Sequence, residues 1–98
     1  MAELSFEWDP SKDAENQHKH RVSFEEAETV FSDEHALLID DPEHSSTEDR
    51  FILLGLSVRF RVLLVVHSYR KEDEVIRIIS ARRATKSERR RYDQRWKP

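Results

Sequence analysis

The stretch VLLVVHSYRKEDEVIRIIS, residues 62–80, decides the fold of this chain. Two apolar runs, Val62 to Val66 and Val75 to Ile79, are separated by Arg70-Lys71-Glu72-Asp73, which is typical of a turn. The two runs therefore predict an antiparallel hairpin. Because neighbouring positions in these runs are both apolar, we expect this hairpin in the middle of a sheet, covered on one face and partly covered on the other.

Two further apolar runs precede this hairpin in the chain. They extend from Ala36 to Ile39 and from Phe51 to Leu56. Turn-like sequences follow them, Asp40-Asp41-Pro42-Glu43 after the first and Val58 to Arg61 after the second. Short connections between consecutive strands favour antiparallel pairing. The sequence therefore predicts an antiparallel sheet of about four strands.

The N-terminal part begins with a short strand and a polar helix. Phe6-Glu7-Trp8 reads as the strand, and Asp9-Pro10 supplies an N-cap and a first helical residue. We expect this helix to extend from about Pro10 to His20. Since its surface is polar, we expect it to pack through Ala14 and the apolar stems of its lysines.

Two capping boxes mark the starts of the other helices. Ser23 and Glu26 can each satisfy a backbone donor at the start of a second helix. Thr85-Lys86-Ser87-Glu88 opens the last helix, which we expect to end near Trp96. The predicted order is β-α-α-β-β-β-β-α. This is an α+β fold with two N-terminal helices packed on the sheet and a C-terminal helix.

Length and composition limit the class of protein. At 98 residues the chain is long enough for one core, so residues 1–98 are expected to form a single domain. The absence of cysteine excludes disulfides and thiolate zinc sites. The start of the chain resembles no signal peptide, and the longest apolar run, Val62 to Val66, is far too short to span a membrane. We therefore expect a soluble cytoplasmic protein without a membrane partner.

Charge is distributed very unevenly along the chain. Residues 1–50 hold 4 Lys and Arg against 15 Asp and Glu, a net charge of −11, whereas residues 51–98 hold 13 against 5, a net charge of +8. Basic side chains that cluster on one face attract polyanions even when the total charge is near zero. The C-terminal half therefore predicts an anionic partner such as a nucleic acid.

His67 is the candidate for acid–base chemistry. The alternation of a strand places it on one face with Leu63, Val65 and Tyr69, and we expect Arg77 to lie nearby across the hairpin. A histidine titrates near neutral pH, and a guanidinium group stabilises a phosphorane. This pair would suit RNA cleavage. The alternative, an ordinary hydrogen-bonded histidine at a strand end, stays open.

Arginines gather where the last strand meets the last helix. Arg77, Arg82 and Arg83 flank this junction, and the amides at the start of a helix favour anions. The junction therefore predicts a phosphate site. Salt bridges to the acidic first half are the alternative use of these arginines.

The last helix itself carries basic and aromatic residues. Its basic residues are Lys86, Arg89, Arg90, Arg91 and Arg95. Tyr92 and Trp96 share one helix face with Arg89. The basic residues either contact nucleic acid or form a solvated face. The aromatic pair either stacks on bases or docks the helix on the domain.

The histidines do not predict a metal site. His18 and His20 point apart on a helix, and His35 and His44 lie in turns. None of the five histidines forms a pair with the spacing that places two ligands on one helix face. We therefore expect no metal.

Taken together, these residues resemble the BrnT toxins of bacterial type II toxin–antitoxin systems. The likeness covers almost the whole chain and is carried by Phe6-Glu7-Trp8-Asp9, Lys19-His20, Val22-Ser23-Phe24-Glu25-Glu26-Ala27, Val30-Phe31, Asp41-Pro42, His44, Arg50-Phe51, Leu54-Gly55, Val65-Val66-His67, Ile76 to Thr85, Glu88-Arg89 and Tyr92.

The resemblance implies a RelE-like fold and a ribonuclease activity that stops translation without a metal or organic cofactor. It also implies a BrnA-type antitoxin as partner. RNA, free or ribosome-bound, would be the substrate, and operator DNA would be contacted only through the toxin–antitoxin complex.

The resemblance also implies site residues. His67, Arg77 and Arg82 are the implied catalytic residues, and the RNA-binding candidates are Lys19, His20, Arg83, Lys86, Arg89 and Tyr92. From this we expect His67→Ala and Arg77→Ala proteins to lose cleavage and keep the wild-type melting curve. Members of the family commonly have glycine after Lys-His, where this chain has Arg21, so we expect a strained left-handed residue or a different turn.

Two other functions use the same features. A small non-catalytic RNA- or DNA-binding module would need the basic strand and helix but not His67 beside Arg77. A structural protein would use its arginines only to pair with its own carboxylates, and it would show no binding and no salt dependence.

Overall fold

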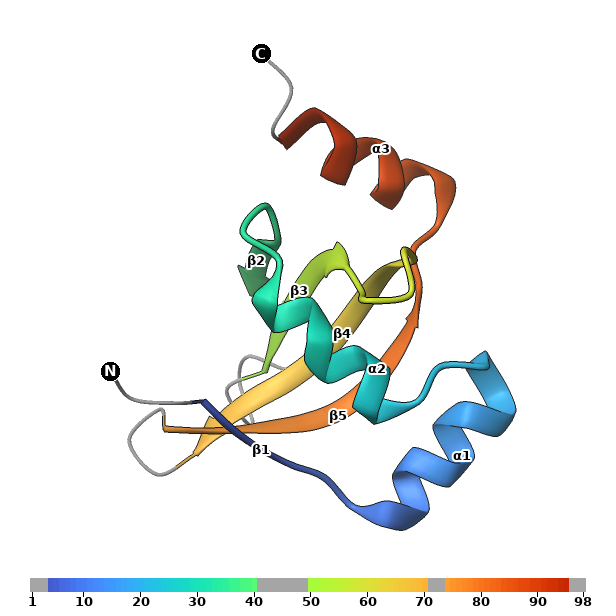
Figure 1. The fold of residues 1–98 in the computed structure, drawn as a ribbon, viewed down its shortest axis with the longest axis vertical. Coiled ribbons are helices and arrows are strands. Elements are labelled where there is room, and N and C mark those ends of the chain that lie inside the picture. The colour runs from blue at the N-terminus through green and yellow to red at the C-terminus, as the bar shows by residue number, and fades with distance from the viewer. Residues whose placement is uncertain (1–3, 41–49, 71–73, 96–98) are drawn as a thin grey trace.

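The computed structural model describes residues 4–40, 50–70 and 74–95, and its elements follow the predicted order (Figure 1). These are β1 (Ser5–Glu7), α1 (Pro10–His20), α2 (Phe24–Thr29), the 3-10 helix η1 (Val30–Ser32), β2 (Leu37–Asp40), β3 (Phe51–Leu56), β4 (Val62–Arg70), β5 (Val75–Arg83) and α3 (Lys86–Arg95). The turn residues 41–43 and 71–73, His44 and Trp96 lie outside the described ranges.

The sheet has five strands in the order β1-β5-β4-β3-β2. Strands β2 to β5 form the predicted antiparallel meander. The strand count and the purely antiparallel character need correction, because β1 adds a fifth strand parallel to β5, with Phe6 opposite Ile76. A parallel neighbour needs a long crossover. Here the chain between β1 and β5 includes two helices and the rest of the sheet.

The central hairpin is longer than its apolar runs. β4 continues past Val66 to Arg70, and β5 continues past Ile79 to Arg83. Backbone pairing continues through polar residues because the ladder bonds do not depend on side-chain polarity. A register shift between Val66 and His67 places one extra residue in β5 at that point.

One face of the sheet is covered by α1 and α2 (Figure 1). Its core combines helix and strand residues that are almost completely buried, namely Val22, Phe24, Ala27, Val30, Leu63, Val65, Ile78 and Ala81. We refer to it as the covered face. The prediction that the N-terminal helices pack on the sheet is therefore confirmed.

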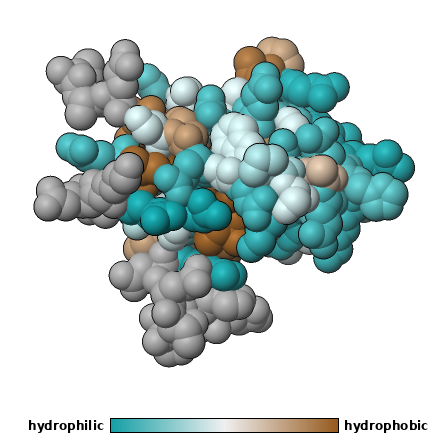
Figure 2. Space-filling model, turned by 90° about the horizontal axis from the view of Figure 1, so that it is seen from below, coloured by the Kyte–Doolittle hydropathy of each residue, from teal (hydrophilic) through white to brown (hydrophobic). Residues whose placement is uncertain are grey.

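Helix α1 is attached by a buried asparagine. Asn16 is 6% exposed, and its amide donates to the carbonyl of Ala81 and accepts from the Ala81 N–H, at 2.8 and 3.1 Å. The same amide donates to the Val22 carbonyl at 2.8 Å. Packing through Ala14 was the wrong prediction, since Ala14 is exposed. The outer side of α1 is hydrophilic (Figure 2).

The opposite face of the sheet, which we call the open face, carries α3 near one end only (Figure 1). Tyr92 of α3 is 4% exposed and packs with Leu54 and Leu64. Its hydroxyl donates to Asp33 at 2.7 Å. Of the two uses considered for Tyr92, docking of the helix on the domain agrees with this position. Stacking on bases would need an exposed ring, and the ring of Tyr92 is buried.

The capping boxes differ in the structure. Thr85 and Glu88 form both bonds of their box, Thr85 N to Glu88 Oε1 at 2.8 Å and Glu88 N to Thr85 Oγ1 at 3.2 Å. Ser23 accepts from Glu26 N at 3.0 Å, but the Glu26 carboxylate turns away to a different set of donors. The predicted reciprocal bond is therefore not made.

The connection between α1 and α2 takes the first of the two forms expected for it, a left-handed residue. Arg21 has φ 60° and ψ 32°, the left-handed conformation, and its N–H donates to Gln17 O at 2.9 Å.

Within the described ranges, no helix is long and apolar enough to cross a membrane.

Candidate functional site

The strand register separates His67 from Arg77. His67 lies opposite Ile78, whereas Arg77 lies opposite Ser68. Successive residues of a strand point to opposite faces. His67 therefore faces the helices and Arg77 faces the open side. Our expectation that they lie together is wrong in this respect: they occupy the same end of the sheet but opposite faces.

His67 is surrounded by aromatic rings rather than by cations. It is 0% exposed, with the rings of Phe31 and Tyr69 edge-on at centroid distances of 4.8 and 5.2 Å. Nδ1 lies 3.2 Å from the Val65 carbonyl and Nε2 lies 3.3 Å from the Tyr69 hydroxyl. Burial lowers the pKa of His67. This is the environment of a neutral core histidine.

A carboxylate and two arginines meet on the open face, and we name them the Glu7 cluster: Glu7, Arg70 and Arg77. Nη1 of each arginine donates to Glu7 Oε2 at 2.8 Å. The hydrogen bond from Arg77 holds the pKa of Glu7 below its ordinary value. Within the described part of the chain, Glu7 Oε1 has no hydrogen-bond partner. The cluster thus presents an ionised carboxylate with one uncommitted oxygen beside two cations.

Exposure makes the Glu7 cluster accessible to a ligand. The side chains of Glu7 and Arg77 are 32% and 35% exposed, and that of Arg70 is 53% exposed. Pairs at this exposure contribute little to stability. A phosphate group approaching the open face could therefore replace Glu7 as the partner of either guanidinium group at small cost.

Arg82 lies on the same open face, opposite Leu64, but it is held more firmly. Its two Nη atoms form a fork with Glu88 at 2.9 and 3.0 Å, and Nη1 also donates to the Arg83 carbonyl. The fork and the capping bond to Thr85 lower the pKa of Glu88 to about 2 and raise that of Arg82. Arg82 therefore fixes the start of α3.

The remaining predicted RNA-binding residues are distributed over two regions. Lys19 and His20 stand in the last turn of α1, Lys19 exposed and His20 half-buried. Arg83, Lys86 and Arg89 are exposed at the junction of β5 and α3. No described carboxylate pairs with Arg83 or Arg89. The junction arginines thus divide into Arg82, which is paired, and neighbours that are available to a ligand.

A second arginine–carboxylate group, which we name the Glu26 cluster, was not predicted from the sequence: Glu26, Ser57 and Arg61. Glu26 is 5% exposed and accepts from Ser57 Oγ at 2.7 Å and from Arg61 Nε at 2.9 Å. Arg61 Nη2 bonds the other carboxylate oxygen. The pKa of Glu26 is lowered by these bonds although burial opposes the shift. The cluster ties the β3–β4 turn to α2.

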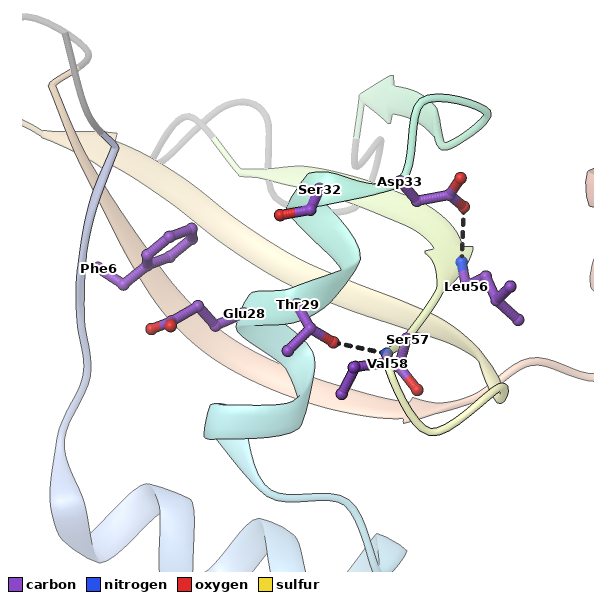
Figure 3. Close-up of a pocket in the computed structure, with 8 residues that line it drawn as sticks. All are labelled: Phe6, Glu28, Thr29, Ser32, Asp33, Leu56, Ser57 and Val58. Carbon is purple, nitrogen blue, oxygen red and sulfur yellow. Dashed lines mark hydrogen bonds between the residues drawn. The ribbon is translucent and has the colours of Figure 1, made fainter.

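The surface hollow drawn in Figure 3 does not suit an anionic ligand. It has a volume of about 480 Å³ and lies between α2, η1 and the end of β3. The described residues that line it include the carboxylates Glu28 and Asp33 and no basic side chain. Asp33 accepts from Leu56 N at 2.8 Å and Thr29 accepts from Val58 N at 2.9 Å (Figure 3). These bonds are structural.

Comparisons with known proteins identify the family and show the fold. A family model described as "Ribonuclease toxin, BrnT, of type II toxin-antitoxin system" matches residues 8–88. Among solved structures, the 1.1 Å crystal structure of the Brucella abortus ribonuclease toxin, BrnT, is similar with a TM-score of 0.66 and 22% identity, covering 86% of this chain and 100% of that chain. At this identity the likeness shows the fold alone. The comparison with curated proteins found no match.

Proposed function

The chain belongs to the BrnT family of ribonuclease toxins of type II toxin–antitoxin systems, and on this premise we propose that it is an endoribonuclease that cleaves messenger RNA and so inhibits translation. A BrnA-type antitoxin neutralises it, and only their complex contacts operator DNA. The protein acts in the cytoplasm, on free or ribosome-bound RNA, without a metal or organic cofactor.

The observation that supports RNA cleavage best is the Glu7 cluster. Glu7 Oε1 takes the proton of a ribose 2′-hydroxyl group, and the 2′-oxygen attacks the adjacent phosphorus. Arg70 and Arg77 stabilise the negative charge of the phosphorane. Water on this exposed face protonates the leaving 5′-oxygen as its bond to phosphorus breaks. The products carry a 2′,3′-cyclic phosphate and a 5′-hydroxyl group.

The other predicted catalytic residues take supporting roles in this proposal. Arg82 positions the start of α3 through its fork with Glu88. The catalytic role of His67 stays a prediction. Its complete burial on the covered face favours a role in packing, and the carboxylate of Glu7 is the better placed base.

The direct test is the incubation of purified protein with total RNA in EDTA. We expect discrete fragments whose 3′ ends are cyclic phosphates. Such fragments can be ligated to an adapter only after an enzyme has opened the cyclic phosphate and removed it, so ligation with and without this treatment detects them. Cleavage that requires an added metal, or fragments with 3′-hydroxyl ends, would contradict the mechanism.

The non-catalytic binding module is the alternative, and the separation of the buried His67 from Arg77 is the observation in its favour. It predicts salt-dependent binding of RNA without fragments. A protein whose arginines serve only its own ion pairs would neither bind nor cleave. The same incubation, with a filter-binding measurement beside it, separates the three.

A further inference from the structure

The turn between β3 and β4 holds an aromatic residue in a backbone conformation that usually selects glycine. Phe60 N donates to Ser57 O at 2.9 Å and Ser57 N donates to Arg61 O at 2.8 Å, which closes a tight turn. Phe60 has φ 62°. This left-handed conformation is unfavourable for a side chain as large as phenylalanine. A glycine or asparagine would satisfy the turn with less strain.

Packing within the domain does not explain this residue. Phe60 is 85% exposed, so its ring gains almost nothing from burial. The turn is nevertheless held firmly, because Glu26 accepts from Ser57 and Arg61, and Thr29 accepts from Val58 N. A strained, exposed aromatic side chain on a fixed turn points to a ligand outside the domain.

The surroundings of Phe60 indicate the chemistry of that ligand. The ring lines a hollow of about 210 Å³ together with Arg61, Val62, Arg83, Ala84 and Arg89. Arg61 is committed to Glu26. Arg83 and Arg89 have no carboxylate partner in the described part of the chain. The hollow therefore combines one aromatic face with two available guanidinium groups.

Basic side chains continue on both sides of this hollow. On one side, Arg59 shares a second hollow with Arg21 and His18. On the other side, Arg89 shares a third hollow with Lys86 and Arg90. Arg61 Nη2 also donates to the Arg21 carbonyl at 3.1 Å, which ties the residue after Phe60 to the other left-handed residue of the described chain. Phe60 thus stands in the middle of a basic edge.

Resting on the ribonuclease function proposed above, we propose that Phe60 is a stacking platform for a base of single-stranded RNA, with Arg83 and Arg89 bound to the flanking phosphates. Stacking needs an exposed ring face and tolerates any base, and unpaired arginines suit phosphates. An apolar protein partner would instead leave two desolvated guanidinium groups in the hollow. RNA therefore fits both features at once.

The platform is a positioning residue, distant from the chemistry. Phe60 precedes the first residue of β4, at the α3 end of the sheet, whereas Arg70 ends β4 at the other end (Figure 1). At the rise of a β-strand the two are roughly 30 Å apart. Loss of the ring should therefore raise KM for long RNA and leave kcat unchanged.

The test compares binding of an uncleavable single-stranded 2′-O-methyl oligonucleotide with binding of an abasic strand of equal charge. We expect Phe60→Gly and Phe60→Asn to weaken binding of the first by roughly 5- to 150-fold and to leave the second unchanged. Phe60→Trp should retain binding. Val58→Ser, which alters an exposed residue of the same turn, is the matched control.

The melting temperature distinguishes a binding role of Phe60 from a role in the stability of the domain. Phe60→Gly relieves the left-handed strain and should raise the melting temperature while binding falls. Arg83→Ala and Arg89→Ala should each reduce the slope of log K against log salt by about 0.7. Parallel losses of stability and binding, or equal losses for both strands, would overturn the proposal.

The outcomes remain distinct from those of the ribonuclease test. Phe60-dependent binding without any RNA cleavage would refute the enzyme and retain the platform. Cleavage with unchanged KM and unchanged oligonucleotide binding in Phe60→Gly would refute the platform alone. If Phe60→Gly weakens only the complex with a co-expressed antitoxin, the turn is a protein contact and the RNA assignment is wrong.

Discussion

The two faces of the sheet both hold carboxylates bonded to arginine, but they use them differently. On the covered side, the carboxylate of Glu26 is 3% exposed and accepts hydrogen bonds at both oxygens. On the open face, Glu7 is 32% exposed and both its arginines bond the same oxygen. Each cluster joins a glutamate carboxylate to arginine. Burial and the number of satisfied acceptors distinguish a structural ion pair from a reactive one.

This contrast explains why arginine content alone is a poor guide to function. Arg61 is fully occupied by Glu26 and the Arg21 carbonyl, so it is unavailable to a ligand. Arg77 bonds one oxygen of the partly exposed Glu7 carboxylate, which a phosphate can replace. Substitutions on the covered side should therefore change stability, and substitutions on the open face should change activity.

The largest effect is expected for Arg61→Ala. This change leaves the buried Glu26 with only the exposed Arg59, 4.0 Å away, as a cation. The free energy of unfolding should therefore fall by about 3 kcal/mol, the lower end for a broken buried pair. Urea unfolding followed by far-UV circular dichroism measures it. The double variant Glu26→Met with Arg61→Met removes both charges and should recover most of the loss. If the loss of stability is smaller than about 1 kcal/mol, the value of a surface ion pair, the two faces do not differ in the way proposed.

On the open face we expect a loss of activity instead. Glu7→Gln should lower kcat/KM for RNA by roughly 10²–10⁴-fold as the base is lost, and Arg77→Ala by roughly 10²–10³-fold. Both should leave the thermal unfolding curve nearly unchanged, because exposed ion pairs contribute little to stability. Glu25→Gln and Lys12→Ala, exposed residues of the helices, are matched controls. A cleavage rate that survives in both variants would remove the Glu7 cluster from the mechanism.

The pH dependence of cleavage sharpens the same assignment. A general base works in its ionised form, and Arg77 holds the pKa of Glu7 below the ordinary 4.5. The midpoint of the acid limb of the wild-type rate–pH profile should therefore lie below pH 4.5. In the Arg77→Ala variant the remaining activity should decline at higher pH. Rate–pH profiles with a fluorogenic RNA measure both, and identical acid limbs would argue against Glu7 as the base.

For His67 we expect a smaller effect, a dependence of the free energy of unfolding on pH. Its folded pKa lies below the unfolded value of 6.5 because the ring is buried, so the unfolded state binds the proton more readily. The free energy of unfolding is therefore unaffected by this ring above pH 6.5. It decreases as the pH falls below 6.5, by up to about 1.4 kcal/mol per pH unit. Urea titrations from pH 7 to 5 measure the slope.

His67→Gln should flatten that slope. The burial of His67 also reverses our expectation from the sequence for His67→Ala. That variant should now melt at a lower temperature than the wild type, because it leaves a cavity among Phe31, Phe51 and Tyr69. An unchanged melting curve would show that the ring is not part of the core.

The smallest effect is expected at the helix connection. Arg21→Gly removes a side chain from a left-handed position but makes the unfolded chain more flexible. The balance should raise the free energy of unfolding by up to about 1 kcal/mol. Differential scanning calorimetry at two salt concentrations separates this gain from the lost charge. A destabilised Arg21→Gly protein would mean that the arginine side chain itself supports the connection.

Part of the fold could be predicted because the decisive signals are local. The apolar runs gave the meander, and the caps at Asp9, Ser23 and Thr85 gave the starts of the helices. Asn16 could not be recognised, because an asparagine that bonds the edge of β5 looks like any polar residue of a solvated helix. The parallel place of β1 was hidden for a similar reason, since three residues carry no pattern that selects a partner strand.

The candidate site was predicted less completely than the fold. Arg77 and Arg82 were singled out from their position before the last helix, but Glu7 and Arg70 were not, since they join Arg77 only across strand pairs. His67 was placed on the correct face of its strand, together with Tyr69. The alternation of the strand does not tell which of its faces the helices cover. That choice decided whether the imidazole would face solvent or aromatic rings.

The sequence by itself determined the order of the elements, the family and the gathering of cations in the C-terminal half, because periodicity, capping and charge act over a few neighbouring residues. Only the tertiary structure decided which carboxylate meets which arginine and which of these pairs water can reach. Ion pairing and burial depend on contacts between strands and helices that lie far apart in the chain. The same residue types therefore form a structural pair at Glu26 and an accessible cluster at Glu7.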